Sequence, residues 1–527
     1  MPTLTVDNFK GSLTRFNNGD INSGFARFDT SFGTDPFVKP GKLTWFETAT
    51  RIDPGDTIIT DLIVAGKERV ESGLSYVYCI GHLGRIYRIQ VNNSTNPDLD
   101  DPVLLATITA QSPTFTRGGW IDFFGTTERI YIGHDIGVTR IDFDGTNETF
   151  IGAAASYTAN VPRPLKQFLG NLYFGNGSNI GEINSAATVT DYTKLSPGFP
   201  DNTQVRDLDV SMDGNYLETV VSRIALPSIL ATTQDNTLIS NAESYIFKWN
   251  GTDVGYTSYN IFPSYSLNSN ISFSDKQFTF GYDVAGACVF NPLTKILSPI
   301  FSEAPLPNAV GSNGNIVGWM IPEFYNGTTR VAHYIYGNLD NEVGIGWWRQ
   351  FAQAAQGNQT NVLKVPFQML VSNFGRGAST NGYTAGIFGS GKLYFSTFEF
   401  VAGTPDYKLY KWFPVATTTG TAIAGVYETQ IQLFSKKIAP KEIRIYTEPL
   451  VTNNAFTVAL IGSDGVIITN SSRTFTVGTS PVASGDDVVW YNPAIEPTYA
   501  IGVRITNSGS ANWTANKIEI DYETAGR

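Results

Sequence analysis

Cysteine, histidine, methionine and charged residues are all scarce in this sequence of 527 residues. It has two cysteines, three histidines and four methionines, and only 16% of its residues are charged, against about 25% in a typical soluble domain. Two cysteines are too few for a small disulfide-stapled scaffold. Cys79 and Cys288 each lie in an apolar, strand-like segment. We therefore expect two buried free thiols, with one structural disulfide as the alternative.

Long apolar segments are also missing. No stretch approaches the 18 apolar residues of a membrane-spanning helix, and the N-terminus lacks the basic and apolar regions of a signal peptide. We expect no membrane insertion, and a protein that acts where it is made or leaves by lysis or assembly. The net charge of −11 and the isoelectric point near 4.9 argue against nucleic acid or an anionic membrane as a partner.

Strand formers and turn residues dominate what is present. Aromatic residues make up 13% of the chain, hydrophobic residues 42%, and there are 51 glycines. Asn, Thr and Ser fill the segments between apolar runs, whereas the Glu/Lys/Ala/Leu mixture of helical proteins is missing. This composition predicts an all-β fold.

A strand–turn–strand unit recurs along the first part of the chain. In each copy an aromatic-apolar strand runs into a glycine, and an apolar residue of the returning strand follows eight positions later. The four clear copies centre on Gly81, Gly133, Gly175 and Gly281. Looser copies follow at Gly337 and at Leu393-Tyr-Phe395, and the segments Ser228–Thr237 and Tyr245–Trp249 fill the gap before Gly281 as parts of one more unit.

Units of roughly 40–55 residues with about four short strands are typical of β-propeller blades, which bury their faces only by packing on neighbouring blades. We predict a β-propeller over residues 49–418 with about seven blades. A series of stacked sandwiches is the alternative.

The last hundred residues have a different pattern. Segments such as Glu428–Phe434, Glu442–Tyr446 and Lys517–Tyr522 alternate apolar with polar residues, which indicates strands with one buried and one solvated face. We predict a C-terminal β-sandwich over residues 419–527, either jelly-roll or immunoglobulin-like.

The first 48 residues fit neither pattern. Turn-rich segments separate isolated phenylalanines, including Phe16, Phe25 and Phe32. We expect residues 1–48 to form an extended arm that docks on a neighbouring molecule and holds the protein in its assembly. The alternative is a strand that closes the propeller ring.

Residues for catalysis do not stand out. His82 and His134 occupy equivalent positions of successive repeats, which favours a structural role in the turn, and His333 has no Cys or His nearby to share a metal. No nucleophile-elbow, zinc-protease or phosphate-loop motif is present. We therefore expect a protein that is not an enzyme and assign no catalytic, cofactor-binding or metal-binding residue. A glycosidase working through channel carboxylates is the alternative.

Two further sets of residues remain open. Asp207, Asp209, Ser211 and Asp213 precede Gly214 with the spacing of a calcium loop, but Val220 stands where the bidentate Glu should be. A polar turn is the simpler interpretation. Exposed aromatics in loops are the expected binding groups, and candidates such as Trp347, Trp348 and Tyr383 cannot be told from core residues by sequence.

The opening Phe9-Lys-Gly-Ser-Leu13, the turn-rich arm, the propeller and the terminal sandwich together resemble structural proteins of tailed bacteriophages, among them tail, nozzle, baseplate and fibre-associated proteins. The resemblance implies a virion component that is assembled in the host cytoplasm and released by lysis. Its partners would be other virion proteins, in a homo-oligomer or with neighbouring tail or capsid proteins, and host-surface glycan is a further expected partner. The alternative is an extracellular propeller that binds or cleaves carbohydrate.

Overall fold

The computed structural model describes two parts of the chain with their side chains. The N-terminal part comprises residues 1–7, 9, 42–45, 51–53, 57–90, 102–115, 118–211, 213–223 and 243–262, and the C-terminal part comprises 425–479 and 482–525. Of residues 28–32, 34–35, 50, 91, 101 and the strands between 263 and 412, mainly the backbone is described, with a few side chains near residues 394–410.

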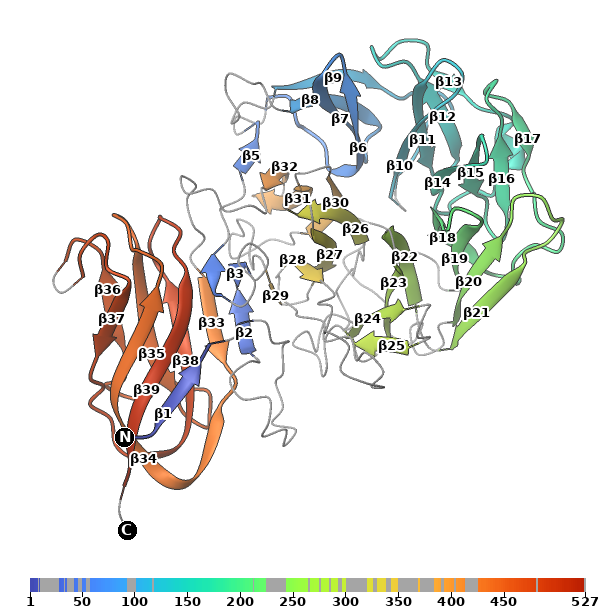
Figure 1. The fold of residues 1–527 in the computed structure, drawn as a ribbon. Coiled ribbons are helices and arrows are strands. Elements are labelled where there is room, and N and C mark those ends of the chain that lie inside the picture. Colours follow the sequence, from blue (N-terminus) through green and yellow to red (C-terminus); the bar gives the residue numbers. More distant parts are fainter. Residues whose placement is uncertain are drawn as a thin grey trace.

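The chain is all-β, as predicted, and folds into a β-propeller with a β-sandwich beside it (Figure 1). Seven antiparallel units of four strands surround a common centre, with the first strand of each unit innermost; six of them are separate sheets, and the sixth along the chain is continuous with a sheet of the sandwich. The only helix among the described residues is η2 (Ala154–Ser156), a single 3-10 turn, and none of the described helices could cross a membrane.

The first four blades follow one another along the chain. Blade 1 contains β6 (Ile63–Glu71), β7 (Leu74–Gly81), β8 (Arg85–Val91) and β9 (Asp101–Thr107). Blade 2 contains β10 (Trp120–Phe124), β11 (Arg129–His134), β12 (Gly137–Ile141) and β13 (Thr149–Phe150). Blade 3 contains β14 (Leu165–Phe168), β15 (Asn171–Gly175), β16 (Ile180–Ile183) and β17 (Val189–Asp191). Blade 4 contains β18 (Gln204–Val210), β19 (Leu217–Ser222), β20 (Glu243–Trp249) and β21 (Ser258–Pro263).

The last three blades complete the ring. Blade 5 contains β22 (Ser266–Phe273), β23 (Lys276–Asp283), β24 (Gly286–Asn291) and β25 (Ile296–Pro299). Blade 6 contains β26 (Met320–Tyr325), β27 (Thr329–Gly337), β28 (Val343–Trp348) and β29 (Gln368–Met369). Blade 7 contains β30 (Tyr383–Gly389), β31 (Leu393–Val401) and β32 (Thr404–Trp412), and takes its outer strand from β5 (Thr50–Ile52).

The repeated glycines occupy equivalent places in the second strands of four blades. They are Gly81 in β7, Gly133 in β11, Gly175 in β15 and Gly281 in β23. A Cβ atom on Gly133 would lie 2.1 Å from the carbonyl oxygen of Arg163, and one on Gly81 would lie 2.1 Å from Oδ2 of Asp61. Asp61 lies just before β6 and Arg163 lies just before β14, and both of these are innermost strands. The glycine of the repeat is therefore required by close approach of another segment.

The core of the propeller lies between the blades. In β11, Ile130 and Ile132 pack toward blade 1, whereas Tyr131 between them packs toward blade 3. The same alternation occurs in β7, where Tyr78 faces blade 2 and Cys79 faces blade 7. Because successive side chains of a strand point to opposite faces, each blade is apolar on both sides and is covered only when the ring is complete.

The side chain of one of the two cysteines, Cys79, is described. Cys79 is a free, fully buried thiol, as expected, and burial raises its pKa. The side chain of Cys288, in β24, lies outside the described residues.

A short N-terminal strand closes the ring. β5 pairs antiparallel with β32 through Leu409↔Ile52, Tyr410↔Arg51 and Lys411↔Thr50. Ile52 and Leu409 are buried in one cluster with Ile63 and Val77 of blade 1. Oγ of Ser396 in blade 7 also accepts a hydrogen bond from the backbone N–H of Ile63 at 3.0 Å. Closure therefore combines backbone pairing with a shared apolar core.

The sandwich consists of two facing sheets. One has the order β1-β39-β34-β37, the other β36-β35-β38-β33-β2, and β34 and β38 also pair with each other. Their bounds are β1 (Thr3–Val6), β2 (Phe28–Phe32), β33 (Gly425–Thr429), β34 (Gln432–Thr447), β35 (Ala455–Ile461), β36 (Arg473–Thr476), β37 (Val488–Tyr491), β38 (Thr498–Asn507) and β39 (Ala515–Thr524). β3 (Thr34–Asp35) and β4 (Thr44–Trp45) form a separate hairpin.

The expectation of an extended arm over residues 1–48 is wrong for its described residues. β1 pairs with β39 and β2 pairs with β33, and Val6, Phe9, Leu43 and Trp45 are buried in the sandwich core. The physical reason is that these isolated apolar side chains find a core within their own chain, where docking costs no association entropy. The flanking phenylalanines Phe16, Phe25 and Phe32 lie outside the residues whose side chains are described.

Candidate functional site

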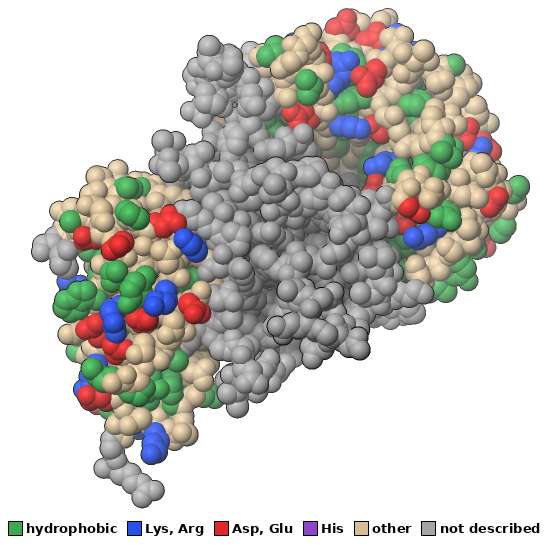
Figure 2. Space-filling view, viewed as in Figure 1, with side chains coloured by type: hydrophobic (Ala, Val, Ile, Leu, Met, Phe, Trp, Pro, Cys, Tyr) green, Lys and Arg blue, Asp and Glu red, His purple; other side chains and the backbone are tan. Residues whose placement is uncertain are grey.

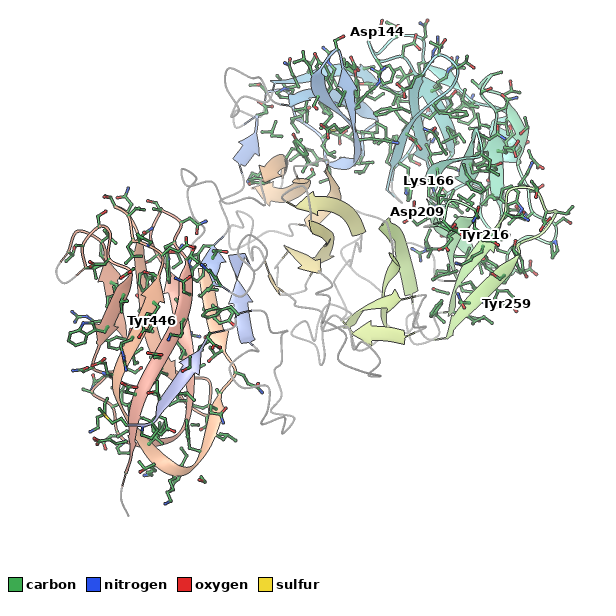
Figure 3. The ribbon with its side chains drawn as sticks, in the orientation of Figure 1. Asp144, Lys166, Asp209, Tyr216, Tyr259 and Tyr446 are labelled. Atoms are coloured by element: carbon green, nitrogen blue, oxygen red, sulfur yellow. The ribbon has the colours of Figure 1, made fainter. Side chains whose placement is uncertain are left out.

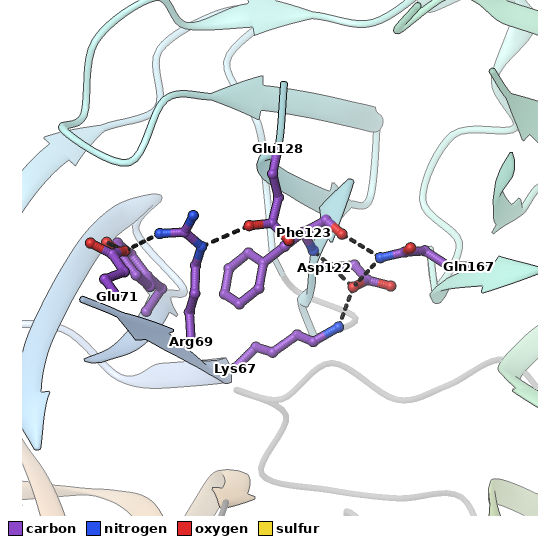
Figure 4. Close-up of polar contacts among 8 residues, drawn as sticks. Lys67, Arg69, Glu71, Asp122, Phe123, Glu128 and Gln167 are labelled. Atoms are coloured by element: carbon purple, nitrogen blue, oxygen red, sulfur yellow. Dashed lines mark hydrogen bonds and ion pairs between the residues drawn. The ribbon is translucent and has the colours of Figure 1, made fainter. Parts of the chain in front are cut away.

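The innermost strands of blades 1 to 3 are joined by a chain of polar contacts (Figure 4). Asp122 in β10 is 6% exposed and accepts from Nζ of Lys67 in β6 and, at 3.3 Å, from Nε2 of Gln167 in β14. The backbone N–H of Phe123 also donates to Asp122 at 2.8 Å, and Nε2 of Gln167 donates to the carbonyl of Phe123. One buried carboxylate therefore ties three consecutive blades together.

A second ion pair continues this chain to blade 4 (Figure 3). Nζ of Lys166 in β14 lies 2.5 Å from Oδ1 of Asp209 in β18. Burial opposes the charged amine, but the negative charges of Asp209, Asp122 and Asp207, together with the hydrogen bond to Asp209, outweigh that effect and raise the pKa of Lys166. We call Lys67, Asp122, Lys166, Gln167 and Asp209 the inner polar chain.

The inner polar chain is better suited to structure than to catalysis. A glycosidase needs one carboxyl group held protonated and a second one free near the sugar. Here Asp122 and Asp209 are each paired with a lysine of a neighbouring blade, so both carboxylates are engaged in contacts between blades. A third contact of the same kind joins Arg69 of blade 1 to Glu128 of blade 2 at 2.8 Å (Figure 4).

His82 lies where blades 7 and 1 meet. Its Nδ1 is in contact with Oδ1 of the fully buried Asp61, and its ring packs against Tyr407 of β32 at 5.4 Å between centroids. The carboxylate of Asp61 also accepts from the backbone N–H of Leu83, at 3.0 Å for Oδ2. Asp61 and His82 thus order the turn between β7 and β8.

His134 is a turn residue and not a general base. Its side chain is fully buried, and its Nδ1 accepts from the backbone N–H of Gly137 at 3.3 Å. Nε2 must then carry the proton and donate to Oγ1 of Thr139, 3.1 Å away. Burial, with a smaller contribution from the charge of Arg163, lowers the pKa of His134 to about 3.

Arg163 is the most connected side chain of this region, and its role was not foreseen from sequence. It is fully buried between blades 2 and 3. Its guanidinium donates to the carbonyls of Gly175 at 2.9 Å and Thr158 at 2.7 Å, and to Oδ1 of Asn176 at 2.7 Å. Burial lowers the pKa of Arg163 to about 10, so the group remains charged at neutral pH while it joins the two blades.

The calcium-like segment forms a strand and a polar turn. Asp209 is paired with Lys166, and Asp213 accepts from Oγ of Ser211 at 2.6 Å and from the backbone N–H of Asn215 at 3.1 Å. The hydrogen bond from Ser211 is the main cause of the lowered pKa of Asp213. No group of three or more His, Cys, Asp or Glu residues that could hold a metal occurs in the part of the chain that the structure describes.

The remaining candidates cannot be placed at side-chain level. His333 is in β27, Trp347 and Trp348 are in β28, and Tyr383 is in β30, but their side chains lie outside the described residues. On the face shown in Figure 2, cationic, anionic and hydrophobic side chains are interspersed over the sandwich. The described part of that face therefore presents no continuous basic surface of the kind that nucleic acid requires.

Comparisons with known proteins add nothing beyond the fold. No protein-family model and no curated protein matches the chain. Solved structures with a similar fold include the extracellular domain of a putative one-component system from B. thetaiotaomicron, with 11% identity and a TM-score of 0.38; 90% of this chain is covered, but the match spans only 62% of that domain. The Dos1 propeller has 12% identity and a TM-score of 0.38, with 74% of this chain and 94% of that one covered. The WD40 domain of Neurospora crassa Pan2 has 8% identity and a TM-score of 0.34, with 68% and 90% covered. Likenesses this distant assign no function.

Proposed function

We propose that this chain is a non-enzymatic structural protein of a bacteriophage virion, belonging to the tail or tail-associated apparatus. The observation that supports the proposal is the path of the N-terminal segment. It contributes β1 and β2 to the sandwich and then β5 to the last blade. The N-terminal segment thus pairs through backbone hydrogen bonds with both the sandwich and the propeller. Such double attachment suits a rigid building block.

Polar side chains of the propeller also support a structural role, because they connect neighbouring blades. Lys67 with Asp122, Lys166 with Asp209, and Arg163 with the carbonyls around it all connect one blade to the next. Partners would be neighbouring virion proteins or further copies of this chain, bound through the rigid faces that these contacts maintain.

The proposal is tested on particles purified from lysates of the cells that make this protein. An antibody against the chain, viewed by negative-stain microscopy, should label one end of the particle or its tail. Mass spectrometry of the same particles should detect the chain in a fixed ratio to the major capsid protein. Particles that lack the chain would contradict a virion role.

A further inference from the structure

The sandwich has an open edge between its two sheets. Among the described residues β36 pairs only with β35, and β37 pairs only with β34, so both are edge strands, and they lie next to each other (Figure 1). A groove with a volume of about 470 Å³ lies along them. We call it the edge groove.

The floor of the edge groove is apolar and rigid. It includes Phe475 of β36 and Tyr491 of β37, whose rings meet edge to face at 5.9 Å between centroids. The hydroxyl of Tyr491 donates to the backbone carbonyls of Ser471 at 2.8 Å and Val458 at 3.3 Å. The floor is therefore part of the core and is formed before any ligand binds.

The rim carries an exposed tryptophan. Trp490 of β37 lines the groove and is 58% exposed. The other tryptophans whose side chains the structure describes are all at most 9% exposed; they are Trp45, Trp120, Trp249 and Trp513. A large aromatic ring left in water beside a formed groove is characteristic of a binding site.

The rim also carries an arginine that the fold does not use. Arg473 of β36 lines the groove, and its side chain forms no ion pair, hydrogen bond or ring contact with another described residue. The other arginines whose side chains the structure describes in the sandwich, Arg444 and Arg504, are paired with carboxylates. The amides Asn470 and Asn492 complete the polar rim.

We propose that the edge groove binds a short oligosaccharide. The indole of Trp490 offers an electron-rich face on which the C–H face of a pyranose ring stacks. The planar donors of Arg473 and the amides of Asn470 and Asn492 match the paired hydroxyls of a sugar, because amides both donate and accept. The volume suits a ligand of about two rings. β36 and β37 have four residues each, which gives an added peptide strand little edge to pair with.

The test uses the purified full-length protein on an array of bacterial surface oligosaccharides, followed by titration calorimetry with the best free oligosaccharide. Trp490→Ala and Arg473→Ala should each weaken binding about tenfold or more. Matched controls are Tyr499→Ala, an exposed aromatic on β38, and Lys436→Ala, an exposed cation on β34, neither of which lines the groove. Both controls should bind as the unchanged protein does.

Two results overturn the inference: binding to no oligosaccharide on the array, or binding that survives both groove substitutions. All four altered side chains are exposed, so thermal unfolding should confirm that each variant folds. The inference does not depend on where the protein resides, because particle labelling and sugar binding are separate measurements. A protein found in the particle that binds no sugar would leave the proposed function standing and remove only the groove's ligand.

Discussion

At the scale of single residues, buried polar groups set the pH dependence of stability. In the unfolded chain His134 titrates near its ordinary pKa of 6.5, whereas in the folded chain its pKa is about 3. Between these values only the unfolded chain binds the proton. The stability contributed by the neutral ring is therefore complete above pH 6.5 and is lost as the pH falls toward 3.

Between pH 7.5 and pH 5 the loss of stability due to His134 should be about 2 kcal/mol. Urea unfolding of the unchanged protein and of His134→Asn, which keeps an acceptor for Gly137, should show this loss only in the former; parallel pH profiles would refute it.

Also at the residue scale, the repeat glycines should tolerate no side chain. In Gly133→Ala the new Cβ would lie 2.1 Å from the carbonyl oxygen of Arg163, so the junction of blades 2 and 3 must move. We expect a loss of about 3 kcal/mol. Gly255→Ala is the matched control, because its nearest atom would lie 3.4 Å away, at ordinary contact distance. Thermal unfolding should separate the two variants, and equal midpoints would count against the close approach.

At the scale of the element, β5 should act through its buried side chain. Ile52 is 4% exposed within the cluster that joins blades 7 and 1. Ile52→Asp places an unpaired charge there and should lower the thermal midpoint by several degrees. It should also make the junction between β32 and β6 susceptible to limited proteolysis. Val103→Asp, at an exposed position of the outer strand β9, should change neither. Proteolysis that is unaffected by Ile52→Asp would show that the ring does not depend on this strand.

The elements also show how far sequence analysis could reach. The repeat was visible because its glycine and its apolar partner lie eight residues apart within one hairpin. The sequence also shows the likeness between Tyr245–Trp249 and Lys408–Trp412. These two segments belong to the third strands of blades 4 and 7. The segment Ser228–Thr237 lies outside the described residues. The inner polar chain was not predictable, because Lys67 and Asp122 meet across 55 residues and neither belongs to a local motif. Trp490 was equally hidden, since alternation alone does not distinguish an exposed tryptophan from a buried one.

At the scale of the whole molecule, the N-terminal segment should stabilise the sandwich more than the propeller. Removing residues 1–45 takes away β1, β2 and the buried Phe9, Leu43 and Trp45. Trp45 packs against Trp513 at 5.7 Å between centroids, and its backbone N–H donates to Asn512. Hydrogen exchange should show that β34 to β39 lose protection in the truncated chain while β10 to β17 keep it. Removal of residues 1–2 alone, before β1, should leave both protected. A truncated chain with an intact sandwich would restore the interpretation of residues 1–48 as an independent arm.

The antiparallel pairing of β1 with β39 has a consequence for synthesis. Thr3 and Asp521 are 518 residues apart, and a ribosome adding about 5–20 residues per second needs roughly 25 to 100 s to bridge that interval. Throughout this time the first strand has no partner, although blades 1 to 4 already have all their own strands. In the nascent chain the unpaired β1 therefore coexists with completed blades. The outer strand of each such blade has a free edge with which β1 could pair incorrectly. The short length of β1, four residues, limits that risk, because so few backbone hydrogen bonds hold any wrong pairing for long.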